Sequence, residues 1–345
     1  MSRCQRVIQS FLACFFACAC LLTLASQGAV THAAASTSSK ATSSCVAPPT
    51  NFNPLTATKS ELDLYGLPPK PTNQQDLQRW VQMVSTAKNR GCGASIARPN
   101  LYSKIKGAKT PGTAKTQAVT PFFSSTSWYT WSGYATGWGY GSGFDEAYGN
   151  WNLPCVSAPD SSGYHSITWV GLGGWYNNEY LLQAGTINDP TWGLSLWWEA
   201  WPSNAIQVIS GISPHCGDKI FSDVWVNYST STSYYYVEDM SQNTYYSNHY
   251  NNFVPDRQSA EWIDERPTCA DGNYTPLANF NYTLFSNSHA EVTGTNTYGT
   301  ISSYRPGSIT MVNNSGATIA APGGLNSAGD SFRDNWYGTG TGELC

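Results

Sequence analysis

The 345-residue chain has few charged residues and lacks the common signatures of hydrolases and metal sites. Charged residues make up 12% of the sequence, about half the share that is usual in globular proteins. No C-x-x-C pair occurs, which argues against a zinc site. There is also no G-x-S-x-G, H-E-x-x-H or D-[ST]-G motif, and the histidines are scattered. We therefore predict that the protein uses neither a metal nor a cofactor.

A long apolar run occurs at the start of the chain, from Phe11 to Leu24. It follows Arg3 and Arg6 and precedes three alanines at 33–35, which is the pattern of a cleaved export signal. The run is short for a membrane span, and polar sequence follows it. We predict a signal peptide over residues 1–35, a secreted, extracellular protein, and no membrane association after cleavage.

Four of the ten cysteines lie in this predicted signal. Acylation of one of them, as in a lipoprotein, is disfavoured because the apolar run continues past them. An even number of cysteines in an exported chain suggests disulfides. The six that remain are Cys45, Cys92, Cys155, Cys216, Cys269 and Cys345. Cys45 with Cys92 would close the region before residue 119, and the other four allow three connectivities.

The charge of the chain divides sharply near residue 119. Residues 36–118 hold eleven Lys/Arg and three Asp/Glu, a net charge of +8, whereas residues 119–345 hold five and nineteen, a net charge of −14. The basic segment has no dense basic run, and export makes nucleic acid an unsuitable partner, so we predict none. We interpret residues 36–118 as a propeptide that binds its own acidic domain as an intramolecular inhibitor.

One amphipathic helix is predicted in this basic arm, over about residues 73–90. Leu77, Trp80, Val81 and Val84 follow the i, i+3, i+4, i+7 spacing of a helical face, and Gly91 is a suitable stop. The segment is too small to bury a core of its own, so the helix should dock on the domain that follows.

Residues 119–345 are predicted to be all-β. Runs of Trp, Tyr, Thr and Val alternate with Gly, Asn, Ser and Pro turns. The predicted strands include 128–134, 148–153, 166–172, 194–199, 219–228, 233–238 and 280–285. A domain of this size built from short strands fits one sandwich or barrel. The polar stretch 241–256 is predicted to be a long loop that overhangs a cleft.

The stretch A-E-W-I-D-E-R-P, which begins at residue 260, concentrates carboxylates in a chain that has few. On a strand, Glu261, Ile263 and Glu265 share one face, and Asp264 points the other way. A glutamate beside Ile on a half-buried face is a candidate general acid or base, because burial raises the pKa of a carboxyl. The alternative is a polar edge strand that carries surface charge.

Two further stretches contain polar residues in apolar surroundings. Gln183 lies in L-L-Q-A-G, where a buried amide must find partners. In W-W-E-A-W-P, strand alternation puts Trp197, Glu199 and Trp201 on one face. A carboxylate between two aromatic rings suits a cleft better than a dry core. The alternative is that these tryptophans only fill the space between sheets.

Five motifs occur in order over roughly residues 125–295: W-V-G, L-L-Q-A-G, W-W-E-A-W-P, G-D-K-I and A-E-W-I-D-E. Together they resemble the glutamic peptidases, also called eqolisins. The resemblance implies a sandwich of two bent antiparallel sheets, a catalytic pair of Gln183 and Glu265, and protein or peptide substrates. Glu265 is preferred to Glu261 because the family's catalytic glutamate is the second one in E-W-I-x-E. The substrate groove implied by the resemblance is lined by Trp169, Trp197, Glu199 and Trp201. We expect a monomer.

The mechanism implied by the resemblance needs no metal and no covalent intermediate. Glu265 takes a proton from a water that attacks the peptide carbonyl, and the Gln183 amide donates to the oxyanion. One position departs from the family pattern: fungal members carry an acid four residues after the W-V-G tryptophan, where this chain has Gly173. Fungal specificity is therefore not expected. A carbohydrate-binding or glycoside-cleaving sandwich is the alternative, with Glu199 and Glu265 as its carboxylate pair.

Overall fold

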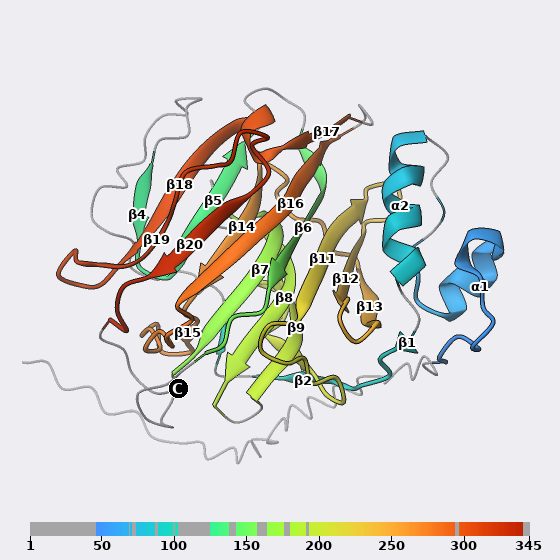
Figure 1. The fold of residues 1–345 in the computed structure, drawn as a ribbon, viewed down its shortest axis with the longest axis horizontal. Coiled ribbons are helices and arrows are strands. Elements are labelled where there is room, and N and C mark those ends of the chain that lie inside the picture. The colour runs from blue at the N-terminus through green and yellow to red at the C-terminus, as the bar shows by residue number, and fades with distance from the viewer. Residues whose placement is uncertain are drawn as a thin grey trace, which may run out of the picture. The chain divides into compact units, whose positions relative to one another are not determined.

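Strands dominate the computed structural model of this chain (Figure 1). The residues that it describes are 46–68, 70, 74–86, 89–98, 101–102, 125–137, 143–156, 164–175, 180–190, 193–293 and 297–340. They belong to one unit, which begins at Ser44. The predicted signal peptide lies outside them. The all-β prediction is confirmed for the region after residue 124.

The first layer of strands contains the predicted site residues. Its pairing order is β2–β10–β9–β8–β7–β14–β5–β18, every neighbouring pair is antiparallel, and β4 joins β18 in parallel. The bounds are β2 Ser95–Ala97, β4 Thr126–Trp128, β5 Trp131–Gly137, β7 Ser166–Gly173, β8 Leu181–Asp189, β9 Gly193–Trp201, β10 Gln207–Ile209, β14 Ser259–Glu265 and β18 Arg305–Val312.

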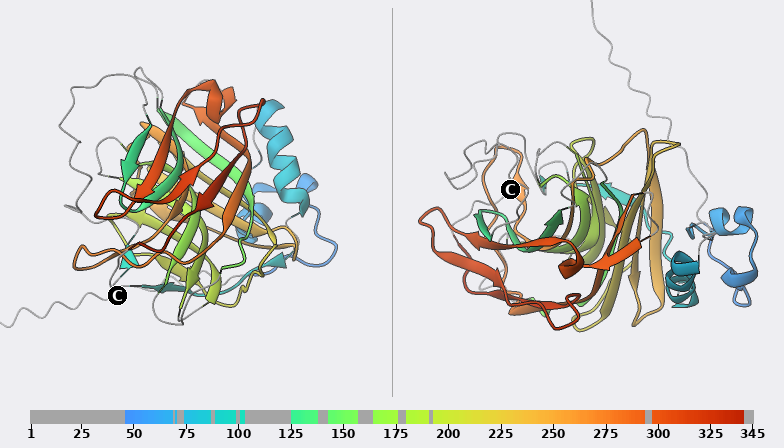
Figure 2. Two further views of the ribbon diagram at one scale, coloured as in Figure 1. Left: turned by 60° about the vertical axis from the view of Figure 1, so that its left-hand side comes forward. Right: turned by 90° about the horizontal axis from the view of Figure 1, so that it is seen from above.

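The second layer packs against the first, and Figure 2 shows the layers from two further directions. Its order is β20–β16–β6–β11–β12–β13–β1, with β17 also beside β16. The bounds are β1 Asn89–Arg90, β6 Phe144–Asn152, β11 Lys219–Asn227, β12 Thr232–Asp239, β13 Thr244–Asn251, β16 Tyr282–Val292, β17 Thr297–Thr300 and β20 Phe332–Trp336. Strand β19, Thr318–Pro322, pairs with both β18 and β20 and so makes the two layers one hydrogen-bonded network.

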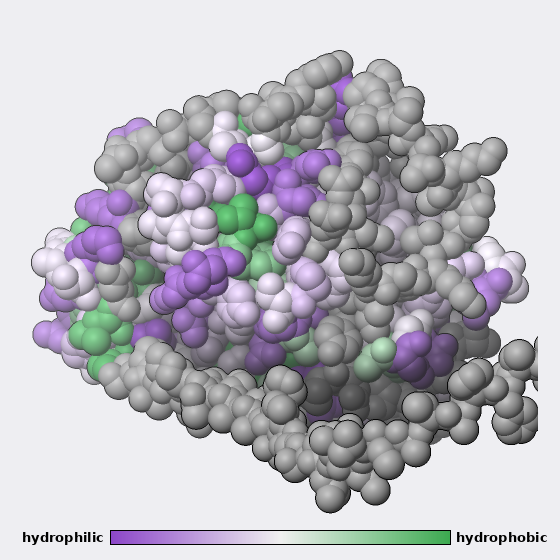
Figure 3. Space-filling view, turned by 180° about the vertical axis from the view of Figure 1, so that it is seen from behind, coloured by the Kyte–Doolittle hydropathy of each residue, from purple (hydrophilic) through white to green (hydrophobic). Residues whose placement is uncertain are grey.

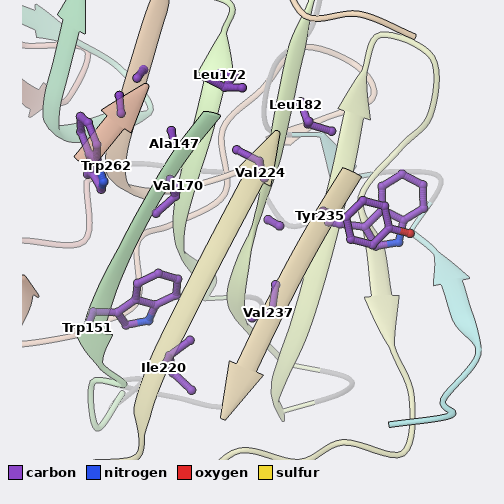
Figure 4. Packing of buried hydrophobic residues seen from close by; sticks show 14 of the residues in the cluster. Ala147, Trp151, Val170, Leu172, Leu182, Ile220, Val224, Tyr235, Val237 and Trp262 are labelled. Carbon is purple, nitrogen blue, oxygen red and sulfur yellow. The ribbon is translucent and has the colours of Figure 1, made fainter. Parts of the chain in front are cut away.

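The main core lies between the layers. Alternation along β7 and β8 directs Val170, Leu172 and Leu182 toward Ile220 and Val224 of β11, all at most 1% exposed (Figure 4). Burial of these side chains supplies about 25 cal/mol for each Å² of apolar surface removed from water. The alternate residues of β7 and β8 therefore face the outer side of the first layer, where the site lies.

The basic arm docks on the outer side of the second layer, as the amphipathic stripe predicts. Helix α2, Gln74–Thr86, buries Trp80 and Val84 to 1% exposure against Phe221, Tyr236 and Tyr245 (Figure 1). The Trp80 indole donates to Pro68 O at 2.9 Å, so its polar atom is satisfied in the interface. A shorter helix before it, α1 over Lys59–Leu64, was not predicted from the sequence.

Two sequence-based predictions are wrong in detail. The helix was expected to continue to about residue 90, but Asn89–Arg90 pair in parallel with β13. The stretch 241–256 was expected to be an overhanging loop, but β13 occupies the middle half of it and pairs along its whole length with β12. In both places the backbone gains hydrogen bonds to a neighbouring strand, which polar composition does not reveal.

One disulfide joins Cys155, just after β6, to Cys216, just before β11. Cys92 and Cys269 are also disulfide-bonded, and Cys45 and Cys345 lie outside the described residues. No described helix is long and apolar enough to cross a membrane. Seen from behind, the coloured surface mixes hydrophilic and intermediate residues with small hydrophobic patches (Figure 3).

Candidate active site

Strand pairing brings Gln183 and Glu265 to the same face of the first layer. Strand β7 lies between β8, which carries Gln183, and β14, which carries Glu265. Gln183 pairs with Gly171, and Gly171 pairs with Glu261, so these three residues form one row across the strands. Glu265 lies four residues further along β14 on the same face, as alternation predicts.

Gln183 is held by Glu199 of β9. The two residues are directly opposite each other in the β8–β9 pair, and Gln183 Nε2 donates to Glu199 Oε2 at 2.6 Å. Both residues are fully buried. A short hydrogen bond to a carboxylate is among the stronger neutral-to-charged contacts in proteins, and it fixes the orientation of the amide. The structure therefore connects Glu199 to Gln183, a contact that the sequence did not predict.

Glu265 is held by Trp169 of β7. The indole Nε1 donates to Glu265 Oε2 at 2.6 Å, and both residues are fully buried. The Trp169 ring lies over Gly171, because a Cβ added at Gly171 would come within 2.7 Å of the ring. The glycine thus makes room for the indole, which lies between the Gln183 row and Glu265.

Further tryptophans surround this indole, and the sequence analysis missed them. Trp131 of β5 is opposite Glu265 in the strand pair, and its ring meets that of Trp169 edge-on, with centroids 5.0 Å apart. Trp128 and Trp175 stack in turn on Trp131. In the sequence, the signal was Trp128 and Trp131, which are three residues apart. It points to the site only once β5 is known to pair with β14.

The residues predicted to line the groove lie on this same face. Trp197 and Trp201 pack in one apolar cluster with Trp169 and Ile263, and Trp197 Nε1 donates to Thr186 O at 3.0 Å. The face is closed in this structure, because Trp197 is fully buried and Trp201 is 4% exposed. The predicted alternation within W-W-E-A-W-P agrees with this placement, since Trp198 packs in the core between the layers instead.

A second pair of carboxyls lies directly behind Glu265. Asp264 Oδ1 accepts from Thr168 Oγ1 at 2.5 Å and from Thr283 Oγ1 at 2.9 Å, and Asp334 Oδ1 accepts from Ser132 Oγ at 2.7 Å. Burial raises the pKa of Asp264 to about 7. Burial, and then the charge of Asp264, raise the pKa of Asp334 well above its ordinary value. The sequence predicted the direction in which Asp264 points but not its partner.

The described part of the chain contains no group of three or more His, Cys, Asp or Glu side chains arranged to hold a metal ion. On the outer face, Gln183, Glu265 and Trp169 supply amide, carboxyl and indole groups in a dry, aromatic setting. A carboxylate and an amide that are both buried and fixed by hydrogen bonds suit the activation of water and the stabilisation of an oxyanion.

The comparison with protein families assigns this all-β chain to a class of peptidases. Residues 129–321 match the model of the Peptidase A4 family, which is more than half of the chain. The chain belongs to that family and is a glutamic endopeptidase.

Two crystal structures of scytalido-glutamic peptidase have a similar fold. The one with a transition state analog inhibitor gives a TM-score of 0.52 at 20% identity, and the match covers 61% of this chain and 98% of that chain. The one with a peptide based transition state analog gives 0.50 at 21% identity, with the same coverage. At this identity the likeness shows the fold alone. No curated protein sequence matches the chain significantly.

Proposed function

We propose that the protein is a secreted, acid-acting endopeptidase that hydrolyses peptide bonds with a water activated by Gln183 and Glu265. The observation that carries the proposal is the pair of 2.6 Å hydrogen bonds on one buried face, from Gln183 to Glu199 and from Trp169 to Glu265. Each bond fixes one member of the pair, and preorganised groups are what catalysis of acyl transfer requires.

In the proposed mechanism, ionised Glu265 takes a proton from a water that attacks the scissile carbonyl carbon. The Gln183 amide donates to the oxygen of that carbonyl as negative charge develops there. Protonated Glu265 then gives its proton to the leaving amine. An amide has two N–H donors, so Glu199 can orient one while the other serves the oxyanion. Glu199 is thus a positioning residue as well as part of the groove.

The groove proposed for protein and peptide substrates is aromatic. Trp169, Trp197 and Trp201 present large apolar surfaces on the catalytic face, and such surfaces bind extended peptides through side-chain packing. The enzyme acts as a monomer in this proposal.

The test of the function compares two classes of substrate. Acid-incubated secreted protein should release peptides from denatured protein at pH 3, much less at pH 7, and no reducing sugar from polysaccharides. Inhibitors of two-aspartate peptidases and metal chelators should leave the activity intact. If polysaccharides release sugar while the protein substrate stays uncleaved, the glycoside-cleaving alternative would be favoured.

The arm is proposed as the enzyme's own inhibitor, released by acid. Its helix covers the second layer, β2 extends the first layer beside β10, and Leu101–Tyr102 pair with Thr268–Cys269 beyond β14. At neutral pH the −14 domain attracts the +8 arm. Carboxylates whose pKa is lowered by this attraction lose its stabilisation as pH falls through about 4, whereas Lys and Arg keep their charge.

We therefore expect acid to produce a mature chain that begins near residue 119. The conversion should occur at pH 3 and not at pH 7, and Glu265→Gln protein should stay full-length in acid because processing is autocatalytic. The conversion is monitored by the size of the chain in gel electrophoresis and by N-terminal sequencing. Full activity at pH 3 with residues 36–118 still attached would contradict the inhibitory role.

A further inference from the structure

The arm places two side chains on the catalytic face, one cationic and one apolar. We infer that Asp189 is a specificity-determining residue of this peptidase, which accepts an Arg or Lys side chain of the substrate in the place that Arg98 of the arm fills in the full-length chain. The inference rests on the proposed function and names the class of substrate that the groove prefers.

Asp189 lies at the end of the strand that carries Gln183. The two are six residues apart on β8, and this even spacing puts them on the same face. The Asp189 side chain is fully buried, and Arg98 Nη2 lies 2.8 Å from its Oδ2. His165 Nε2 is 3.8 Å from the same oxygen. A buried carboxylate of this kind depends on a paired cation, because an uncompensated charge is costly to bury.

Leu101 follows three residues after Arg98 and reaches the tryptophans of the catalytic face. It is 2% exposed and packs in the apolar cluster that contains Trp169, Trp197 and Trp201. These are the tryptophans proposed to bind substrate, so the arm already occupies their surface with an aliphatic side chain.

The backbone of the arm is fastened at both sides of this face. Arg98 N donates to Ile206 O at 2.8 Å, and Ile206 N donates to Leu101 O at 3.4 Å, which ties the segment to the stretch between β9 and β10. Leu101 also pairs with Cys269, four residues beyond Glu265. Arg98 and Leu101 therefore bind the rim of this face through backbone groups and place their side chains on it, as the residues of a bound peptide do.

Removal of the arm takes away the Arg98 guanidinium and opens the Asp189 carboxylate to the groove, with His165 of the domain 3.8 Å from its Oδ2. A substrate with a basic side chain at this position restores the ion pair, whereas a neutral substrate does not. The contact is remote from the reacting atoms and is equal in the ground and transition states, so it should lower KM and leave kcat unchanged.

The test determines the cleavage specificity from the residues that surround many cleaved bonds. Full-length secreted protein is incubated in acid and then digests a mixture of denatured proteins at pH 4, and the products are sequenced by mass spectrometry. We expect Arg and Lys to be enriched at least tenfold at one fixed distance from the cleaved bond. Asp189→Asn should lose this enrichment. Asp271→Asn, which changes an exposed aspartate in a turn, should keep it.

A second measurement uses only the wild-type enzyme, so its result does not depend on the folding of a variant. Two fluorogenic peptides are made that differ only in Arg or the neutral citrulline at the enriched position. Wild-type enzyme should show at least a tenfold lower KM for the Arg peptide at similar kcat. Equal KM values, or enrichment that persists in Asp189→Asn, would overturn the role of Asp189 and leave the peptidase function standing. Absence of any cleavage would remove the peptidase function itself.

Discussion

Glu265→Gln should abolish peptide cleavage, with kcat/KM lowered by about 10³-fold or more, while the fold is retained. General acid–base groups contribute about 10²–10⁴-fold to a reaction, and the amide that replaces Glu265 can neither take the proton from water nor return it to the amine. Gln is close to Glu in size, so it fits the same site and still accepts from the Trp169 indole, which now donates at 2.6 Å. Activity is measured on a denatured protein substrate at pH 3, and folding by circular dichroism.

Glu261→Gln is the matched control for this variant. Glu261 is also fully buried, lies on the same face and shares the row of Gln183, so burial alone does not choose between the two glutamates. The Glu261→Gln variant should retain clearly more activity than Glu265→Gln. Gln183→Ala should lose about 10²–10³-fold, as is usual when one oxyanion donor is removed. A reversed order of the two glutamate variants would assign the proton transfer to Glu261.

The Asp264–Asp334 pair should make the fold less stable as pH rises from about 4 to about 7. Neither Oδ2 atom has a hydrogen-bond partner among the described side chains, so ionisation would leave buried charge on these atoms without compensation. The pKa of Asp264 is about 7 in the folded chain and about 3.9 when unfolded. Between these values the folded state binds more protons than the unfolded state, so the free energy of unfolding falls with rising pH.

Asp334→Asn should weaken this dependence. The amide keeps an acceptor for Ser132 and can donate to Asp264, while the like-charge repulsion within the pair disappears. With about 1.4 kcal/mol for each pKa unit and about 2–4 °C for each kcal/mol, the fall in Tm between pH 4 and 7 should shrink by about 5 °C or more. The measurement is thermal unfolding at several pH values, made in the Glu265→Gln background to prevent self-cleavage.

Asp271→Asn serves again as a control and should follow the wild-type curve, because Asp271 is exposed. If Asp334→Asn and wild type lose stability in parallel between pH 4 and 7, the pair is not the group that titrates. The result bears on function because Asp264 adjoins Glu265, so loosening of this contact at neutral pH disturbs the strand that carries the general base.

The strand content of the main domain, the docking helix of the arm and the family could all be predicted from the amino-acid sequence. Each depends on local pattern. The stripe of Leu77, Trp80, Val81 and Val84 repeats with the period of a helix, and the strand runs alternate with the period of a sheet. The five ordered motifs led to the family that the match over residues 129–321 shows. Alternation also placed Glu261 and Glu265 on the face opposite to Asp264, as the strand pairs have it.

Which side chains contact one another follows from the fold and could not be predicted. The contacts of Gln183 with Glu199, of Trp169 with Glu265 and of Asp264 with Thr168 depend on strand order and register, which are set by pairing between segments far apart in the chain. The formation of β13 within the polar stretch 241–256 has the same cause. The salt bridge from Arg98 to Asp189 joins residues 91 positions apart, and no periodicity predicts it, because its geometry follows from how the arm crosses a curved sheet rather than from the residues beside either partner.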